Sequence, residues 1–517
     1  MTVRVFVPQD TSARSVGADA VAAAMQHAIA ALNRDVELVR NGSRGLFWLE
    51  PLVEVDVAGT RIAYGPVTAE QVPSLFAARF LDGGEHPLRL GPTEEIPYLR
   101  NQDRITFARA GIDDPLDLAA YERMGGLAGL RRALELEPNQ IIEEVDSSGL
   151  RGRGGAAFPA AIKWRTVADQ ENETKYVCCN ADEGDSGTFA DRLLMEADPF
   201  CLLEGMAIAG LATGARQGLI YLRSEYPLAL AMLMAAIAKM RAAGWLGESV
   251  GESGRRFDIE VRRGAGAYIC GEESAMLESL EGKRGVVRAR PPIPAVAGLF
   301  GKPTLVHNVL SLAAIPYILA HGGAAYARFG VGRSRGTQAF QLAGNVRRGG
   351  LVEKSFGITL RELVEEFGGG TRSGRPFKAA QVGGPLGGYL DSAMLRLEMD
   401  YESLAERGAM LGHGGIVVFD DRVDMAEMAA LAFEFCAHES CGKCTPCRIG
   451  SVRGAETVRR IMAGEDAATN FALLDDLCDL MTDASLCALG GLTPMPVRSA
   501  IRLYRAEIDG RANRGSL

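Results

Sequence analysis

K-Y-V-C-C-N (Lys175–Asn180), G-L-I-Y-L-R (Gly218–Arg223) and F-D-I-E-V-R (Phe257–Arg262) are three strand-like runs in the middle of the chain, and helical stretches separate them. Parallel strands need long connections that are usually helices, so this alternation over roughly 180 residues predicts a parallel, doubly wound sheet. Ligands of such sheets bind at the carboxyl ends of the strands. We therefore expect a Rossmann-like α/β domain over residues 116–335, with its site in the glycine-rich loops at those ends.

At 517 residues the chain is too long for a single core, and several domains are expected. Thr68 and Gln71 have the spacing of a capping box, which predicts a helix start within an N-terminal α/β module. Beyond the central domain the pattern changes first to short strands with many glycines and then to helices. The other expected parts are the α/β module (1–82), a linker (83–115), a small α+β unit with its connection (336–424) and a helical bundle (425–517).

The charge and hydropathy patterns exclude several classes of protein. A formal net charge of -9 argues against a nucleic-acid partner, because duplex binding usually requires a concentrated basic face. The N-terminal residues do not resemble a secretion signal, so the cytoplasm is the expected location. The longest apolar run, Pro227–Ala238, is shorter than the roughly 20 residues that span a bilayer, so membrane association is expected only through partners.

Cys441, Cys444 and Cys447 form a C-x2-C-x2-C run, and Cys487 follows in S-L-C-A-L-G. Three closely spaced thiolates can bind three corners of an iron-sulfur cube while a distant thiolate binds the fourth. Structural zinc sites more often use two separated C-x2-4-C pairs, so the spacing favours a [4Fe-4S] cluster over zinc. Two further cysteines of this region are expected to be buried thiols: Cys436 and Cys478.

A glycine-dense loop, G-R-G-G-A-A-F-P (Gly152–Pro159), opens the central domain. Successive glycines let backbone amides approach a phosphate, and Arg153 and Lys163 offer positive charge. The loop therefore suits a phosphorylated ligand. It follows an apparent helix, whereas a dinucleotide fingerprint follows a strand, so an ordinary turn is an equal alternative from this motif alone.

Two polar segments follow predicted strands of the same domain. Asn180, Asp182 and Glu183 of N-A-D-E-G-D-S-G-T-F can bind ribityl hydroxyls, although an isolated segment of this kind is more often an acidic surface turn. In Y-I-C-G-E-E-S, Glu272 and Glu273 stand where a helix begins, and carboxylates there also cap helices.

A phosphate cradle, carboxylates and a redox cluster together indicate electron transfer. Hydride carriers deliver two electrons whereas iron-sulfur clusters accept one, so a flavin is the usual intermediary. Two alternatives from other classes stay open at this point. They are a flavin-free iron-sulfur scaffold with vestigial glycine loops and a zinc-stabilised binding protein.

Over roughly residues 115–510 the chain resembles the NADH-binding flavoprotein subunit of respiratory complex I and its soluble relatives. Four motifs in the family's order carry the resemblance: R-G-R-G-G-A-x-F-P, N-A-D-E, Y-I-C-G-E-E and the cysteine run with S-L-C-A-L-G. P-A-V-A-G-L-F-G-K-P-T (Pro294–Thr304) is also similar. The resemblance implies FMN, one [4Fe-4S] cluster, NAD(H) and diaphorase activity, with a β-grasp-like fold for residues 336–391.

By position, the resemblance also implies the site residues. Those expected to bind FMN are Gly152, Arg153, Gly154, Gly155, Lys163, Asn180, Asp182, Glu183, Tyr268, Gly271, Glu272, His307 and Asn308. Phe158 is expected to stack on the adenine. Glu273 is expected to hold the NADH ribose and Asp185 to stand near the nicotinamide, both as catalytic residues.

Three positions depart from the family's pattern and bear on nucleotide affinity and flavin potential. Asp185 stands where the family usually has the longer glutamate, and Ile293 replaces an aromatic residue that stacks on adenine. His307 replaces an asparagine beside the flavin. We interpret His307 as a neutral hydrogen-bonding replacement, in preference to a proton-coupled group.

R-G-L-F-W-L-E-P (Arg44–Pro51) and the hairpin after it resemble the thioredoxin-like half of the complex I [2Fe-2S] subunit. No cysteine precedes Cys178, so this module lacks thiolate ligands and is expected to be a docking remnant. A cysteine-free module of this kind resembles the beta subunits of soluble, molybdenum-containing NAD-dependent formate dehydrogenases, which reduce NAD+ with electrons from formate. The expected partners are then a [2Fe-2S] subunit and a large molybdenum/iron-sulfur subunit. The flavoprotein subunits of complex I and of NAD-linked hydrogenases stay open as alternatives.

Overall fold

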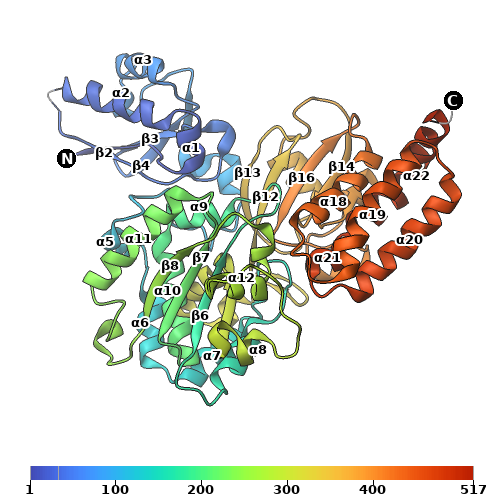
Figure 1. Cartoon of the computed structure of the whole chain (residues 1–517). Coiled ribbons are helices and arrows are strands. Elements are labelled where there is room, and N and C mark those ends of the chain that lie inside the picture. Colours follow the sequence, from blue (N-terminus) through green and yellow to red (C-terminus); the bar gives the residue numbers. More distant parts are fainter. Residues whose placement is uncertain (1, 33, 516–517) are drawn as a thin grey trace.

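Three larger sheets and a helical bundle follow one another along the chain in the computed structural model, which describes residues 2–32 and 34–515. Figure 1 shows the N-terminal module at the upper left, the central sheet below it and the C-terminal helices at the right. A mixed sheet lies between the module and the helices. The expected multidomain α/β architecture with a helical C-terminal part is confirmed.

The N-terminal module is a five-stranded sheet with the order β2-β1-β3-β4-β5. Its strands are β1 (Val3–Phe6), β2 (Val36–Val39), β3 (Val53–Val57), β4 (Thr60–Tyr64) and β5 (Arg89–Pro92), and its helices are α1 (Thr11–Ser15), α2 (Ala18–Ala30) and α3 (Val72–Ala77). The capping box of Thr68 and Gln71 is present, as the spacing predicts. Strand β5 lies inside the segment expected to be a linker. The sequence does not predict it, because its four residues are too few and too rich in glycine and proline to show a period.

The central domain has four parallel strands in the order β8-β7-β6-β9. These are β6 (Tyr176–Ala181), β7 (Gln217–Leu222), β8 (Asp258–Arg263) and β9 (Thr304–Asn308). The first three are the strands that the sequence predicts, and β9 is additional. Strand order runs outward from β6 to β8 and then reverses to β9 on the other side, which makes the gap between β6 and β9 a topological switch point, where ligands of such sheets bind.

Helices enclose this sheet and supply most of its core. Before β6 they are α5 (Leu118–Arg123), α6 (Ala128–Glu135), α7 (Pro138–Ser147) and α8 (Ala160–Ala168), whereas α4 (Pro97–Arg100) packs in the core of the third sheet. Between β6 and β9 they are α9 (Ala190–Ala197), α10 (Pro199–Thr213), α11 (Pro227–Ala242), α12 (Glu273–Leu280) and α13 (Pro294–Ala297), and after β9 they are α14 (Val309–Ala313), α15 (Ile315–His321) and α16 (Gly323–Tyr326). Every residue of α10 is buried, so this helix is the centre of the domain.

The third sheet has the order β13-β12-β16-β14-β15, with β12 and β16 parallel and the other pairs antiparallel. Its strands are β12 (Thr337–Gly344), β13 (Gly350–Ser355), β14 (Phe377–Val382), β15 (Tyr389–Asp391) and β16 (Gly415–Asp420), preceded by the short β10 (Gly330–Val331) and β11 (Ser334–Arg335). One helical stretch, Glu362–Phe367, and α17 (Tyr401–Glu406) accompany the sheet.

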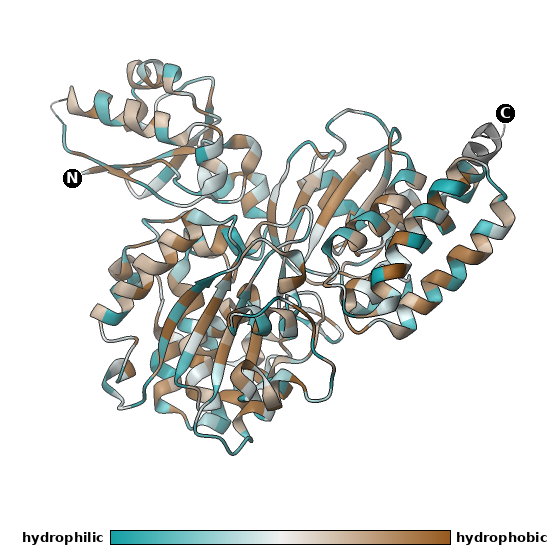
Figure 2. Ribbon diagram, viewed as in Figure 1, coloured by the Kyte–Doolittle hydropathy of each residue, from teal (hydrophilic) through white to brown (hydrophobic). Residues whose placement is uncertain are grey.

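The C-terminal part consists of α18 (Met425–Glu439), α19 (Thr445–Met462), α20 (Ala467–Ala484), α21 (Ala488–Leu492) and α22 (Pro494–Gly515). Figure 2 shows hydrophobic residues gathered along the strands of the central sheet, whereas these helices alternate between hydrophobic and hydrophilic residues. Across residues 2–32 and 34–515, no helix combines the length and the apolar character that a membrane crossing demands.

The N-terminal module docks on α9 through polar contacts. The backbone N–H and the Oγ of Thr11 both donate to the carboxylate of Glu196, at 2.7 and 2.6 Å. Arg192, one turn earlier on α9, donates to the Oγ of Ser12 at 2.8 Å. Glu196 is 1% exposed, and burial raises its pKa to about 7.

The docking contact predicts a pH dependence of stability. The pKa of Glu196 is about 7 in the folded chain and 4.5 ordinarily, so the folded state binds the extra proton between these values. Stability is therefore expected to fall as pH rises from about 4.5 to about 7, by on the order of 3 kcal/mol from this group, and then to level off. Glu196→Gln is expected to flatten the melting temperature measured from pH 5 to 8. The exposed Glu143→Gln is the control, and parallel curves for wild type and Glu196→Gln would contradict the assignment.

Candidate functional site

The carboxyl ends of β6 and β9 meet at the switch point. Asn180 and Asn308 are paired in register there. The Nδ2 of Asn180 donates to the carbonyl of Gly271 at 2.7 Å, and the Oδ1 of Asn308 accepts from the backbone N–H of Leu310 at 2.9 Å, which caps α14. Two of the predicted site residues thus lie side by side at the expected edge of the sheet.

The glycine loop packs directly over the end of β9. A Cβ at Gly154 would lie 2.9 Å from the Cβ of Asn308, which only a glycine avoids. Gly155 has φ +108°, where a side chain is strained, and it pairs with Gly412. A Cβ at Gly152 would meet nothing closer than the carbonyl of Phe158 at 3.7 Å. The loop connects α7 to α8, so it follows a helix as the sequence indicates.

The side chain of Arg153 does not serve the role expected for it. It is 3% exposed, and its guanidinium donates to the carbonyls of Arg151, Arg335 and Thr337 at 2.7, 2.7 and 3.1 Å. It also donates to the Oη of Tyr326 at 2.9 Å. The guanidinium of Arg153, expected to face a phosphate, instead holds the glycine loop against residues 326–337, which lead into the third sheet. Only the main chain of Arg153 stays in the loop.

Lys163 and Glu273 form the charged wall of the site. The Nζ of Lys163 lies 3.2 Å from the Oε2 of Glu273, and Arg290 lies 3.1 Å from the Oε1 of Glu273. Glu272 accepts from the backbone N–H groups of Ser274 and Ala275, both at 2.9 Å, and also pairs with Arg290. Glu272 is therefore the cap of α12, which was one of its two interpretations. Glu273 points instead to the lysine that follows the glycine loop.

Two acids in and just after N-A-D-E, Asp182 and Asp185, have raised pKa values. The Oδ2 of Asp182 is buried without a hydrogen-bond partner among the described residues, and burial raises the pKa of Asp182 to about 7. Burial also raises the pKa of Asp185, although the hydroxyl of Tyr268 donates to its Oδ1 at 2.8 Å and opposes the shift. Tyr268 and Asp185 are thus in direct contact, although more than eighty residues separate them along the chain.

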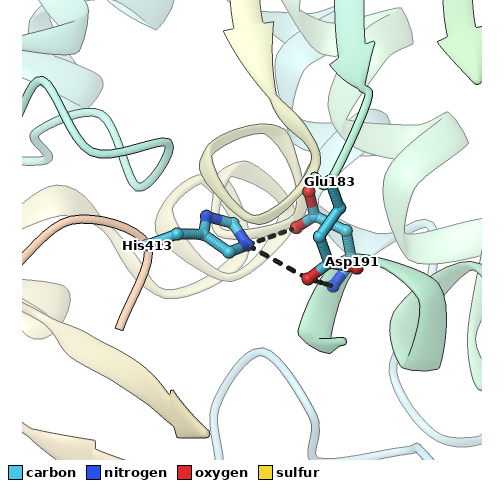
Figure 3. Close-up of side chains that lie close together, drawn as sticks. All are labelled: Glu183, Asp191 and His413. Carbon is cyan, nitrogen blue, oxygen red and sulfur yellow. Dashed lines mark hydrogen bonds and ion pairs between the residues drawn. The ribbon is translucent and has the colours of Figure 1, made fainter. Parts of the chain in front are cut away.

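Glu183 lies in a buried cluster with Asp191 and His413, drawn in Figure 3. The Nε2 of His413 points toward both carboxylates, 3.1 Å from the Oδ1 of Asp191 and 3.4 Å from the Oε1 of Glu183. The sequence motif pointed to Glu183 alone. Asp191 had a weak signal, an acid in the first turn of the helix after the polar loop, whereas His413 lies outside every motif.

His307 is a neutral hydrogen-bond acceptor in the core. Its Nε2 accepts from the indole N–H of Trp164 at 2.9 Å. Burial lowers the pKa of His307 to about 3, and the charge of Lys163 acts in the same direction. This agrees with the interpretation as a neutral replacement for asparagine. Phe158 and Ile293, the two positions expected near an adenine, are 45% and 46% exposed.

The four predicted cluster cysteines lie at the start of two helices. Cys444 and Cys447 begin α19, Cys441 lies in the loop before it, and Cys487 precedes α21. A Cβ at Gly490 of α21 would lie 2.7 Å from the Cβ of Cys447, so the two helix starts are in contact. Each thiolate of a cube binds its own iron, so these sulfurs need not converge as ligands of a single ion do.

Cys436 is buried beside this set and is not exposed at the loop. Its Sγ lies 3.7 Å from the Sγ of Cys447, and the Oγ of Ser440 lies 3.2 Å from the same sulfur. The hydrogen bonds from Cys436 and Ser440 lower the pKa of Cys447 to about 6, against the effect of burial. A thiolate is the form that binds iron, so the local chemistry suits a ligand role for Cys447.

Helix α18 and the loop between α18 and α19 both contact the central domain. The Nζ of Lys443 donates to the carbonyl of Val287 at 2.6 Å, and the ring of Phe435 packs against Tyr268 with centroids 4.9 Å apart. Tyr268 is the residue that binds Asp185. The two predicted redox sites are therefore neighbours in space, although about 170 residues separate their motifs along the chain.

The residues fit the expected cofactors in three respects. The Oδ2 of Asp182 is a buried acceptor with a free lone pair for a hydroxyl. A Cβ at Gly152 would fill open space beside the loop, although the N–H groups of Gly152 and Arg153 already donate to the carbonyl of Phe158 and the Oγ of Ser311, both at 2.8 Å. The amides expected to approach a phosphate are therefore those that follow in the loop. Four cysteines gathered at two helix starts are a donor set for an iron-sulfur cube.

Comparisons with known proteins also separate an FMN-binding part from an iron-sulfur part of the chain. The family model described as the Nuo51 FMN-binding domain matches residues 145–317, and the one described as the NADH-ubiquinone oxidoreductase-F iron-sulfur binding region matches residues 427–511. The F 2 subunit of NADH-quinone oxidoreductase of Rhizobium meliloti (strain 1021) is 47% identical over 404 residues, which cover 78% of this chain and 96% of that protein. NADP-reducing hydrogenase subunit HndC of Solidesulfovibrio fructosivorans is 43% identical over 414 residues, which cover 80% of this chain and 84% of that protein.

A solved structure is similar over more of the chain. It is a chain in the crystal structure of NAD+-reducing [NiFe]-hydrogenase in the air-oxidized state, which is 29% identical with a TM-score of 0.70. The alignment covers 98% of this chain and 85% of that chain.

Proposed function

Because the chain belongs to the NADH-quinone oxidoreductase flavoprotein family, whose FMN, [4Fe-4S] cluster and NAD(H) it shares, we propose that it is the NADH-reacting subunit of an NAD-linked formate dehydrogenase. In this role it reduces NAD+ with electrons that a partner subunit takes from formate. Its membership in an oxidoreductase of several subunits follows from the relatives, whereas the choice of formate is the proposal.

The N-terminal module is the observation that carries this proposal. The Rhizobium relative matches 78% of the chain, whereas the hydrogenase structure aligns with 98% of it. The family models begin at residue 145, so the N-terminal module lies outside them, and the alignment of the module with the hydrogenase structure favours an NAD-linked oxidoreductase over complex I. The same observation also favours a second candidate, the diaphorase subunit of an NAD-linked hydrogenase.

The protein supplies alignment for a hydride transfer. A bound FMN would supply two-electron chemistry toward the nicotinamide and one-electron chemistry toward the cluster. Lys163 and the amides of the glycine loop hold the phosphate. Asn180 and Asp182 bind the ribityl hydroxyls, Glu273 binds the ribose of NADH, and Asp185 lies near the nicotinamide. No side chain needs to act as a nucleophile, so positioning supplies most of the rate advantage.

The partner complex is tested by reconstitution. The chain is combined with its [2Fe-2S] and molybdenum/iron-sulfur partner subunits, and NAD+ reduction is measured with formate and with hydrogen, alongside quinone reduction by NADH. Formate-dependent NAD+ reduction is the expected result. In the cell, we expect the complex to lie in the cytoplasm. Activity with hydrogen or quinone alone would favour the second candidate or complex I.

The FMN site is tested by a matched pair of glycine substitutions. Gly152→Ala adds a Cβ with no protein atom closer than 3.7 Å, so the melting temperature of the FMN-free protein is expected to be unchanged. Its affinity for FMN is expected to fall about tenfold or more, because the methyl group holds the phosphate away from the amides. Gly154→Ala is expected to lower both quantities, since its Cβ lies 2.9 Å from the Cβ of Asn308.

Fluorescence titration with FMN and thermal unfolding of the FMN-free protein give the two readouts. If Gly152→Ala binds FMN as wild type does, the phosphate does not lie at this loop. The assignment of an FMN site first requires that denaturation of the purified protein releases a flavin, detected by its absorption at about 450 nm.

A further inference from the structure

His413 reaches the site from another part of the chain. It lies between α17 and β16, in the segment of the third sheet, and is 6% exposed. Its backbone carbonyl accepts from the side-chain amides of Gln338 and Gln341 on β12, at 3.3 and 2.9 Å. These bonds fix the main chain at the point where the imidazole enters the central domain.

Both ring nitrogens of His413 are engaged. Nδ1 lies 2.9 Å from the carbonyl oxygen of Arg153, which can only accept, so Nδ1 carries a proton. Nε2 faces the carboxylates of Asp191 and Glu183. Burial alone would lower the pKa of His413, but these two carboxylates raise it well above its ordinary value. The ring is therefore an imidazolium that donates from Nδ1 to the carbonyl of Arg153 and forms ion pairs through Nε2 with the two carboxylates drawn in Figure 3.

The three partners of His413 belong to three separate walls of the site. Arg153 lies in the glycine loop, and Glu183 belongs to the N-A-D-E segment. Asp191 accepts with its other oxygen from the Nδ2 of Asn308 at 2.7 Å, at the end of β9. No other described residue makes hydrogen bonds or ion pairs with both carboxylates and the glycine loop.

The two carboxylates have only neutral partners besides His413 among these contacts. Glu183 accepts from the backbone N–H groups of Asp191 and Arg192, both at 3.1 Å, and from the Oη of Tyr226 at 3.0 Å. Without His413, two buried acids would face each other with no cation between them. Such an arrangement is costly, because removing one partner of a buried ion pair leaves uncompensated charge.

We infer that His413 is a positioning residue of the FMN site, whose imidazolium forms ion pairs with Glu183 and Asp191 and so holds the glycine loop, the N-A-D-E segment and the end of β9 together. The inference rests on the proposed FMN site. It assigns His413 no contact with FMN or NADH, and its effect on them passes through the segments that it joins.

The test is a double-variant cycle on the full-length chain. His413→Gln keeps a donor for the carbonyl of Arg153 but removes the charge, and it is expected to weaken FMN binding about tenfold or more. The midpoint potential of the FMN that still binds is expected to become more negative, since two uncompensated carboxylates oppose the addition of electrons. The control is His27→Gln, at an exposed position on α2, for which neither quantity is expected to change.

Adding Asp191→Asn to His413→Gln removes one of the two uncompensated acids. The double variant is expected to bind FMN more tightly than His413→Gln alone, and its potential is expected to return toward that of wild type. If His413→Gln does not fold, the double variant is expected to fold. Restored folding then takes the place of restored FMN binding as the evidence for rescue.

Several outcomes would overturn the inference. FMN affinity and potential in His413→Gln equal to those of wild type would do so, as would a double variant that is no better than the single variant or fails to fold with it. A stoichiometric metal other than iron that is present in wild type and lost in His413→Gln would replace the imidazolium with a metal site. Wild-type protein that does not bind FMN at all would instead refute the proposed function.

Discussion

Cys444→Ala is expected to remove the iron-sulfur cluster while NADH-dependent reduction of an artificial dye continues. The iron content should fall from about four to about zero atoms per chain, because one iron of the cube is left without its thiolate ligand and the cluster becomes labile. The dye takes electrons from FMN directly, and the FMN residues lie in the central domain. Electron transfer to the partner subunits is expected to be lost. Iron and acid-labile sulfide are measured in anaerobically prepared protein, together with dye reduction.

Cys478→Ala is the matched control for this variant. Cys478 is a thiol of the same helical bundle, 1% exposed on α20, and it is not one of the four proposed ligands. Its loss should leave iron and sulfide in place. Full iron content in Cys444→Ala, or its loss in Cys478→Ala, would show that the ligand set is wrong.

Glu273→Ala is expected to raise the KM for NADH about tenfold to a hundredfold while FMN stays bound. A hydrogen bond to a charged group contributes roughly 1.5 to 3 kcal/mol, and the lost ribose contacts correspond to that range. FMN is expected to stay because Lys163, released from its 3.2 Å contact with Glu273, keeps its charge for the phosphate. Lys163 and Glu273 are both partly exposed, so their ion pair adds little to stability.

Glu278→Ala is the control on the same helix. Glu278 also pairs with an arginine, Arg288 at 2.6 Å, but it belongs to neither cofactor motif. Steady-state kinetics and the flavin content of the purified protein give the two readouts. A KM for NADH in Glu273→Ala equal to that of Glu278→Ala would place the ribose elsewhere, and a loss of flavin would place Glu273 at FMN instead.

Patterns that are local in sequence were sufficient for much of the fold. The runs that became β6, β7 and β8 are six residues long, contain at least three apolar residues each and are separated by helical stretches, and each is a strand. Strand β9 was missed because T-L-V-H-N is short and contains only two apolar residues, and its partner β6 lies more than a hundred residues earlier. Strand β5 was missed for the related reason that pairing with β4 defines it, since its own residues show no period.

The same distinction applies to the candidate site. Cys441, Cys444 and Cys447 were recognisable because metal ligation by a short loop imposes a spacing on the sequence. Arg153 was assigned to a phosphate because its position in a glycine loop suggests it, yet its guanidinium donates to one neighbouring carbonyl and to three acceptors of a distant segment. His413 could not have been found from a motif, since its three partners lie more than two hundred residues away along the chain.

The sequence alone pointed to two chemistries, a glycine loop suited to a phosphate and a set of thiolates, because the glycines and three of the four proposed thiolates lie within a few positions of one another. Only the tertiary structure decided which charges face the site. The direction of a buried side chain depends on the acceptors and opposite charges around it, and folding brings these from segments that are far apart in the chain. Arg153 turned toward carbonyl groups and His413 toward carboxylates for that reason.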